Sequence, residues 1–189
     1  MPTASTELMT LDEFLSLPDD GIERELIAGV LKERPMTKRN RYHAKAEASI
    51  AYALNAWRRP QPLPRGDVLS GEVGFTLRRD PDSGVGIDVA YISPETAAAQ
   101  TDDQSTMIVG VPMLAVEILS PSDKQEDIND KIDEYLAVGV KLIWIVDPHF
   151  RTVTVHRCDG KPEFFTSDEE LTAEPHLPGF RVLVQSFFE

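Results

Sequence analysis

The sequence predicts an α/β (mixed α+β) fold in which a central mixed β-sheet is flanked by helices. Runs with the two-residue apolar period of strands alternate along the chain with segments that have the 3.6-residue period of amphipathic helices. The chain has 189 residues, of which 41% are apolar. This length suits one domain with a sizeable core. We place the domain at residues 9–189 and expect residues 1–8 to form a flexible N-terminus.

The N-terminal third is predicted to form a short helix, a β-hairpin and a long helix. Thr10 stands three residues before Glu13, which is the spacing of a capping box at the start of a helix. Residues 24–27 and 30–33 flank a short Ala-Gly turn and predict two hairpin strands. Residues 41–58 are alanine-rich, with apolar residues at helical spacing, and predict the first long helix.

The middle of the chain is predicted to form two strands and a surface excursion. Residues 67–79 alternate as a half-buried strand does, and residues 85–92 form the next strand. Residues 94–107 are polar and alanine-rich, and we expect a helical surface segment there. In strand 85–92 simple alternation sets Asp88 on one face with Ala90 and Ile92, and sets Ile87, Val89 and Tyr91 on the other face.

The next stretch predicts a buried strand at 113–118 followed by a helix that ends at Gly139. Ser122 with Gln125 has the spacing of a second capping box. Lys131 falls at the edge of the apolar stripe of this helix, where a long side chain can lie against the core and return its ammonium toward the sheet. Residues 141–147 and 152–158 then predict a strand hairpin, and several late aromatic and aliphatic residues supply further core, namely Phe164, Phe165, Leu171, Phe180 and the 182–188 segment.

Composition limits the classes of function. The net charge of −13 argues against a general nucleic-acid coat protein, yet residues 32–65 hold nine Lys and Arg against two Asp and Glu. This segment suits anion binding or a solvated helix face. No apolar run is long enough to span a membrane and no signal peptide is found, so we expect a cytoplasmic protein. The single cysteine, Cys158, excludes an internal disulfide and is expected to pack rather than react.

Two carboxylates, Asp88 and Glu117, lie on apolar strands, and the cost of burying each charge has to be offset by another group. Side by side they would repel, so one is protonated, a cation pairs with them, or a hard metal ion binds between them. Mg²⁺ or Mn²⁺ fits best because these ions take carboxylates, carbonyls and water. Lys131 could then orient or help to deprotonate an attacking water, and Glu25 on the hairpin could serve as a further ligand or base.

The alternative is that both acids face water on edge strands while Lys131 only solubilises its helix. His43 could contact a phosphate, but a capping or surface role is the favoured interpretation. Tyr135 is expected to be a core residue.

The same residues resemble a known family. The resemblance lies in five motifs: Glu25-Leu-Ile with Gly29, Asp88-Val-Ala-Tyr-Ile, Val116-Glu-Ile-Leu-Ser-Pro-Ser-Asp123, Lys131 with Tyr135 and Gly139, and Trp144-Ile-Val-Asp-Pro148. These motifs are similar to those of the Uma-two family of restriction-endonuclease-like proteins, within the PD-(D/E)xK nuclease superfamily. The resemblance implies a metal site at Asp88, Glu117 and the backbone carbonyl of Ile118. It also implies catalytic roles for Glu25, Asp88, Glu117 and Lys131. Val30 and Ile87 depart from the family pattern, where a glutamate and a proline are usual.

Two hypotheses follow from the residues and the resemblance. The first is a Mg²⁺- or Mn²⁺-dependent endonuclease that hydrolyses phosphodiester bonds in DNA, binds nucleic acid through the basic 32–65 region and acts as a homodimer, with no membrane partner. The second is a catalytically inactive binding or assembly module that retains the nuclease fold.

Overall fold

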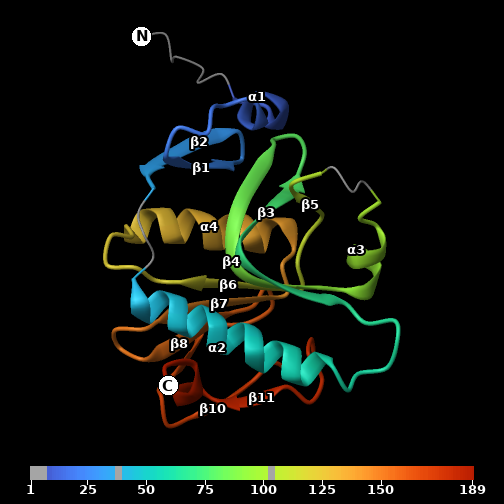
Figure 1. Cartoon of the computed structure of the whole chain (residues 1–189), viewed down its shortest axis with the longest axis vertical. Helices are drawn as coiled ribbons and strands as arrows, with labels where there is room; N and C mark the ends of the chain where they lie inside the picture. Colours follow the sequence, from blue (N-terminus) through green and yellow to red (C-terminus); the bar gives the residue numbers. More distant parts are fainter. Residues whose placement is uncertain (1–7, 37–39, 102–104) are drawn as a thin grey trace.

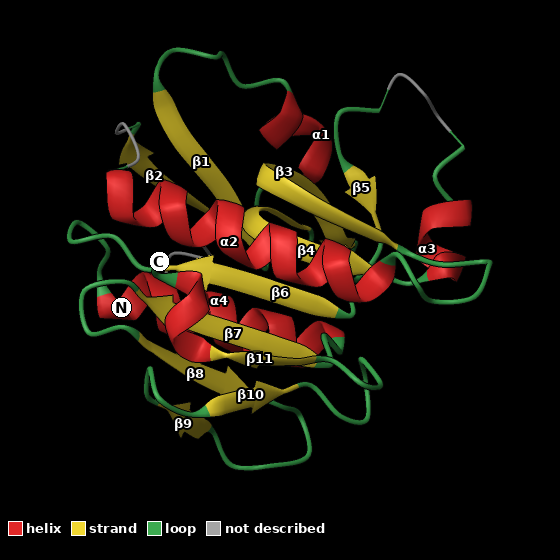
Figure 2. Cartoon of the chain, turned by 60° about the horizontal axis from the view of Figure 1, so that its bottom comes forward, coloured by secondary structure: helices red, strands yellow, loops and turns green. Residues whose placement is uncertain are grey.

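The computed structural model describes residues 8–36, 40–101 and 105–189. A mixed β-sheet forms its centre, with a long helix packed on each face (Figure 1; Figure 2). Within the described residues the strands form a nine-stranded sheet and a separate two-stranded sheet. The predicted fold class, with its N-terminal helix and hairpin, is confirmed. The segment expected to be flexible lies outside the described residues, apart from Leu8.

The helices and strands follow one another in an order close to the predicted one. In chain order they are α1 Leu11–Leu15, β1 Ile22–Ile27, β2 Val30–Pro35, α2 Arg41–Arg58, β3 Asp67–Arg78, β4 Ser83–Ile92, α3 Pro94–Ala98, β5 Ile108–Val109, β6 Leu114–Ile118, α4 Gln125–Val138, β7 Leu142–Asp147, β8 Thr152–His156, β9 Glu163–Phe165, β10 Glu170–Thr172, β11 Arg181–Leu183 and the 3₁₀ helix η1 Val184–Phe187.

The large sheet runs in the order β2-β1-β4-β6-β7-β8-β9, with β3 paired to β4 and β5 paired to β3. β6 and β7 are parallel, and α4 is the crossover helix that connects them. The β4–β6 pair is antiparallel. β4 therefore lies between the hairpin and the β6-α4-β7 unit, and brings the early and late parts of the chain together.

The two long helices cover opposite faces of the sheet (Figure 2). α2 buries Ala46, Ile50 and Leu54 in a cluster that also holds residues from β6, β7, β8 and the C-terminal segment. α4 buries Ile128 and Ile132 in a second cluster with β3, β4 and β6. The apolar stripes predicted for these helices are therefore the surfaces that pack on the sheet.

Local sequence sets most of the element ends. Thr10 and Glu13 form the predicted capping box of α1, since each side chain accepts a hydrogen bond from the other residue's backbone N–H. Asn40 caps α2 by accepting hydrogen bonds from the first backbone N–H groups of the helix. Gly139 ends α4 with a left-handed φ of 92°, a conformation that glycine adopts without strain.

The predicted capping box of Ser122 and Gln125 is wrong. α4 begins at Gln125, and Lys124 occupies the N-cap position without a side-chain cap. The carboxylate of Asp123 instead accepts a hydrogen bond from the backbone N–H of Ser120, at 2.7 Å. The connection from β6 therefore turns at 120–123, before the helix starts.

Three further details of the prediction are corrected. Ile87 packs in the α4-side cluster with Ala90 and Ile92, so the simple alternation predicted for β4 fails at that residue. The expected helical segment 94–107 is only the short α3 followed by β5, with residues 102–104 outside the described part. Cys158 is exposed and Phe164 is 62% exposed, so neither packs in the core.

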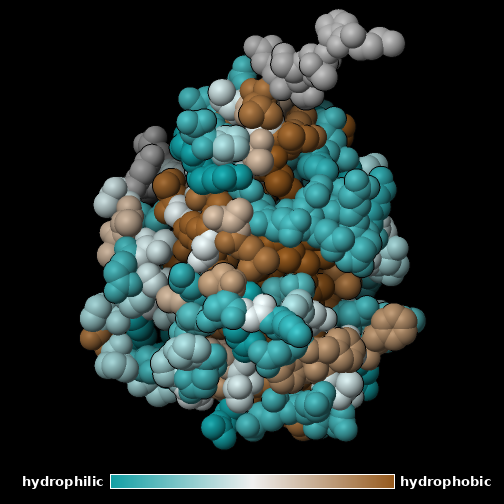
Figure 3. Space-filling model, turned by 180° about the vertical axis from the view of Figure 1, so that it is seen from behind, coloured by the Kyte–Doolittle hydropathy of each residue, from teal (hydrophilic) through white to brown (hydrophobic). Residues whose placement is uncertain are grey.

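The face opposite to the view of Figure 1 exposes a band of apolar residues in the half that carries α1 and the hairpin (Figure 3). In this half β2 is the outermost strand of the sheet, and several of its residues are in contact with solvent. Among the described residues, no helix combines the length and apolar character that crossing a membrane requires.

Candidate active site

The sheet forks where β4 and β6 stop pairing. Their ladder runs from Tyr91 opposite Leu114 to Val89 opposite Val116. One step further along, Oδ2 of Asp88 accepts a hydrogen bond from the backbone N–H of Ile118 at 2.8 Å. The carboxylate of Asp88 therefore fills the fork, beside the position of Glu117.

Glu117 is held by hydrogen bonds at both carboxylate oxygens. Its Oε2 accepts from Lys131 Nζ at 2.8 Å, and its Oε1 accepts from the hydroxyl of Tyr135 at 2.6 Å. Lys131 and Tyr135 are four residues apart on α4, so they project from the same side of the helix. The tyrosine is thus a core residue, as predicted, whose hydroxyl also fixes the orientation of the carboxylate.

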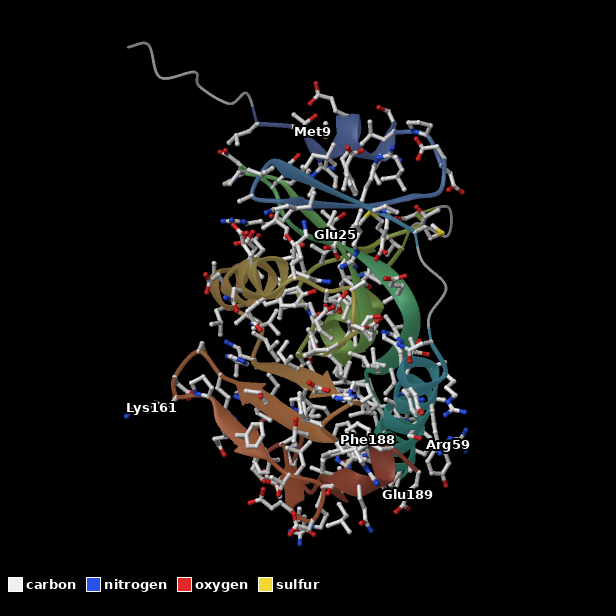
Figure 4. The ribbon with its side chains drawn as sticks, turned by 90° about the vertical axis from the view of Figure 1, so that its left-hand side faces the viewer. Met9, Glu25, Arg59, Lys161, Phe188 and Glu189 are labelled. Atoms are coloured by element: carbon white, nitrogen blue, oxygen red, sulfur yellow. The ribbon has the colours of Figure 1, made fainter. Side chains whose placement is uncertain are left out.

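Lys131 connects the hairpin to the sheet. Its Nζ donates to Glu25 Oε1 at 2.8 Å and to the carbonyl of Gly86 at 2.9 Å, in addition to Glu117. Glu25 comes from β1, on the side of the hairpin that faces α4 (Figure 4). Lys131 is 3% exposed, so its ammonium belongs to a buried network rather than to a solvated surface ion pair.

His43 lies on the other side of Asp88. The imidazole is 1% exposed, and its Nε2 is 3.3 Å from Asp88 Oδ1 while its Nδ1 is 3.8 Å from Glu47 Oε2. The interpretation of His43 as a capping or surface histidine is wrong. A signal was available in the sequence, because His43 shares its helix face with Ala46 and Ile50, the residues that make the buried stripe of α2.

Burial and neighbouring charges shift the pKa values of Asp88 and Glu117 in opposite directions. Burial raises the pKa of Glu117 to about 7; Lys131 opposes this rise, and the charges of Asp88 and Glu25 add to it. Burial also acts to raise the pKa of Asp88, but His43, a backbone N–H and Lys131 together hold it below its ordinary value. At neutral pH Asp88 is therefore ionised while Glu117 is close to its midpoint.

Lys131 and Tyr135 keep their protons. Burial acts to lower the pKa of Lys131, but the charges of Glu117 and Glu25 outweigh it and hold the pKa well above its ordinary value. Burial and the neighbouring Glu117 raise the pKa of the Tyr135 hydroxyl well above its ordinary value. Both groups therefore act as hydrogen-bond donors in this site, and a neutral lysine is not available as a base.

A protein-family comparison decides the family. The Uma2 model, described as "Putative restriction endonuclease", matches residues 11–185. The chain belongs to the Uma2 family. The family resemblance drawn from the sequence motifs is thereby confirmed.

A solved structure shares the fold of this chain. A crystal structure described as "a putative nuclease belonging to DUF820 from Anabaena variabilis ATCC 29413" superposes with a TM-score of 0.77 at 23% sequence identity, over 95% of this chain and 97% of that chain. A search of curated proteins found no match. The architecture and the family description support a nuclease of the restriction-endonuclease type.

The structure brings together the side chains that the sequence singled out in this Uma2 chain. Glu25, Asp88, Glu117 and Lys131 are 8%, 5%, 7% and 3% exposed. The alternative in which both acids face water and the lysine solubilises its helix is therefore wrong. Their meeting point is the junction of β1, β4, β6 and α4.

The donor set at this junction suits a hard cation. In the described part of the chain, no three His, Cys, Asp or Glu side chains are grouped around one point as ligands. Asp88 and Glu117 nevertheless offer two buried carboxylates, and Mg²⁺ is commonly bound through one or two carboxylates while it keeps several waters. Glu25, Asp88 and Glu117 together outnumber the ammonium of Lys131, so added positive charge would be favoured there.

Three of the nine basic residues in the 32–65 segment form ion pairs with acidic side chains among the described residues. Lys32 contacts Asp130 at 2.7 Å, and Arg34 and Arg58 contact Glu23 and Asp67, each at 2.5 Å. Other basic residues of the segment, Arg41, Lys45 and Arg59, are exposed on or next to α2. Lys38 and Arg39 lie outside the described residues.

Proposed function

We propose that this chain is a metal-dependent endonuclease that hydrolyses phosphodiester bonds in DNA. The observation that carries the proposal is the buried contact of Lys131 Nζ with Glu117 Oε2, 2.8 Å long, beside Asp88 at the β4–β6 fork. An acid pair with an adjacent ammonium is the combination that phosphodiester hydrolysis uses, because negative charge builds up on the phosphoryl oxygens.

The proposed ligands are the carboxylates of Asp88 and Glu117 and the backbone carbonyl of Ile118. A bound Mg²⁺ or Mn²⁺ would supply Lewis acidity and a water of lowered pKa. Ligation requires an ionised Glu117, whose pKa is about 7, so we expect metal binding to release a proton and to strengthen as the pH rises.

The side chains around this pair have separable roles. Lys131 keeps its proton and stabilises the charge that develops on the phosphate. Its three N–H groups bond Glu25, Gly86 and Glu117, so it orients the attacking water only when Glu117 Oε2 ligates the metal and releases one of them. Glu25 holds the ammonium in place from the hairpin at 2.8 Å and is the accessory acid. His43 orients Asp88 from the opposite side, at 3.3 Å. We assign the approach of DNA to the exposed cations Arg41, Lys45 and Arg59, and propose that the protein acts as a homodimer.

One observation favours a second candidate, a catalytically inactive binding or assembly module. The ion-pair network is closed in this structure, since Lys131 is bonded to Glu25, Gly86 and Glu117, and Glu117 is bonded at both oxygens. Such a network could be purely structural. Calorimetry with Mn²⁺ separates the candidates, because a purely structural network predicts no binding that depends on Asp88 and Glu117.

The proposal is tested by incubating supercoiled, linear duplex and single-stranded DNA with the protein and Mg²⁺ or Mn²⁺. We expect metal-dependent cleavage that Asp88→Asn and Lys131→Met abolish, while circular dichroism shows that both variants fold. Lys141→Met, at an exposed position just before β7, is the matched control and should cleave normally. Intact DNA in every combination of substrate and metal would contradict the proposal.

A further inference from the structure

A cleft of about 790 Å³ lies where α2 begins and where β6 and β7 end. Three segments that are far apart in the sequence form it, and they meet at the left-hand edge of the view in Figure 1. They are the start of α2 with Asn40 and Tyr42, the β6–α4 connection with 119–121, and the β7–β8 turn with 147–151. The volume is in the range of sites that hold a small organic ligand or a nucleotide.

The cleft adjoins the Asp88 side of the candidate site. Tyr42 directly precedes His43, whose Nε2 is 3.3 Å from Asp88 Oδ1. Leu119 directly follows Ile118, whose backbone N–H is bonded to Asp88. Two residues of the cleft lining are therefore chain neighbours of two residues that contact Asp88.

Two aromatic rings are presented to solvent in this cleft. Tyr42 is 56% exposed and Phe150 is 73% exposed. The Phe150 turn is fixed rather than loose, because Asp147 Oδ1 accepts hydrogen bonds from the backbone N–H groups of His149 at 2.8 Å and Phe150 at 3.0 Å. The rings of His149 and Phe150 contact edge to face, with centroids 4.9 Å apart. The cost of exposing these rings is unexplained by packing within the chain.

Cations accompany the rings. Arg41 Cζ lies 4.6 Å from the centroid of the Tyr42 ring. Arg151 lines the cleft, and its guanidinium lies 5.9 Å from the ring of Phe188, labelled in Figure 4. On a protein with a net charge of −13, two arginines next to a cleft with two exposed rings are a local departure that favours an anionic, aromatic ligand.

We propose that the cleft binds unpaired bases of the substrate strand, so that the substrate class is single-stranded or frayed nucleic acid. Proteins that bind single strands stack bases on aromatic side chains and neutralise phosphates with nearby cations. In a paired duplex each base face is covered by its neighbours, and the rings of Tyr42 and Phe150 have nothing to stack on. The assignment of the bound strand as a substrate rests on the proposed nuclease function.

The test is fluorescence anisotropy in EDTA, where cleavage is blocked, with a labelled oligothymidylate of about 16 nucleotides and a blunt duplex of equal length. The variants are Tyr42→Leu and Phe150→Leu, which remove the ring but keep an apolar side chain, and Phe150→Trp, which keeps a ring. Phe164→Leu is the matched control, because Phe164 is 62% exposed on β9, outside the cleft.

We expect each ring-to-leucine change to weaken single-strand binding by about 5- to 150-fold, the range measured for loss of one stacked base. Phe150→Trp and Phe164→Leu should bind as the unaltered protein does, and duplex binding should not change. The inference would be overturned if the variants lost as much affinity for the duplex as for the single strand, or if the unaltered protein did not bind the single strand. Full binding by Phe150→Leu would also overturn it, and is the result expected of a cleft that docks an apolar protein segment.

Cleavage assays separate this inference from the proposed function. Ring-dependent binding of the single strand without cleavage in Mg²⁺ or Mn²⁺ would leave the inference standing and remove the nuclease proposal. Metal-dependent cleavage of duplex DNA that is unchanged in Tyr42→Leu and Phe150→Leu would leave the nuclease proposal standing and overturn the inference.

Discussion

Replacing Lys131 with methionine removes the cation that the buried acids share. Methionine has a similar length and keeps the packing of the aliphatic stem, but it cannot donate hydrogen bonds to Glu25, Glu117 or the carbonyl of Gly86. The variant therefore removes the charge and the hydrogen bonds of Lys131 without a large change in the volume of the core.

The expected loss of stability follows from the burial of the partners. Glu25 and Glu117 are 8% and 7% exposed, and both lie 2.8 Å from Lys131 Nζ. Breaking a buried ion pair by removing one partner costs about 3–5 kcal/mol, because the remaining charge has no compensation. For a protein of this size a loss of that magnitude lowers Tm by roughly 10 °C.

The assay is urea unfolding followed by circular dichroism at pH 7.5 and at pH 5.5. The deficit of Lys131→Met should shrink at the lower pH, since the orphaned carboxylates are then protonated in the folded state. Mn²⁺ should restore more stability to the variant than to the unaltered protein, because a divalent cation can replace the lost charge. Lys141→Met, at an exposed position, should stay within about 0.5 kcal/mol of the unaltered protein.

A deficit below about 1 kcal/mol at pH 7.5 would refute this reasoning, because that value is typical of an exposed pair. A deficit that grows on acidification would refute the assignment of the charge to Glu25 and Glu117.

Three further predictions concern the same site. The pKa of Glu117 is about 7 in the folded protein against an ordinary 4.5, so between these pH values the folded state binds a proton that the unfolded state has lost. The free energy of unfolding of the metal-free protein should therefore fall by about 3 kcal/mol as the pH rises from 4.5 through 7, and Glu117→Gln should remove this pH dependence in urea titrations. His43→Gln should reduce metal affinity or cleavage by about 10- to 100-fold while the circular dichroism spectrum is kept, because Asp88 loses the group that orients it; unchanged Mn²⁺ calorimetry and kinetics would contradict this. Tyr135→Phe should destabilise the protein by about 1.5–3 kcal/mol, the cost of a hydrogen bond to a charged group, and a change within about 0.5 kcal/mol would show that the hydroxyl does not support Glu117.

Periodicity and capping predicted the elements that local sequence controls. The bounds of α2 coincide with the predicted 41–58, and the hairpin around Gly29 forms where the turn residues place it. The strands β10 and β11 were not predicted, because they are three residues long and are stabilised by packing against the core rather than by their own pattern. The failure of alternation at Ile87 has a similar origin, since β4 has different partners along its length.

The candidate site was predictable as a set of residues but not as a network. A carboxylate in an apolar strand marks Glu117, and helical geometry places Lys131 near the sheet. The hydrogen bond of Lys131 with Glu25 joins residues that are 106 positions apart, so it depends on where the hairpin docks. The helical spacing of His43 with Ala46 and Ile50 indicates that its side chain is buried, but its contact with Asp88 exists only because α2 crosses the β4–β6 fork. Long-range contacts of this kind are set by tertiary packing, and no local pattern specifies them.

The central claim is that Asp88 and Glu117 hold a divalent cation next to Lys131. Anomalous diffraction from a crystal soaked in Mn²⁺ tests it most directly. The claim predicts an anomalous peak between the two carboxylates, with the Lys131 ammonium directed at the waters of the ion. A crystal that shows Mn²⁺ elsewhere only, or shows Lys131 still bonded to Glu117 and Glu25 with no peak between the acids, would contradict it.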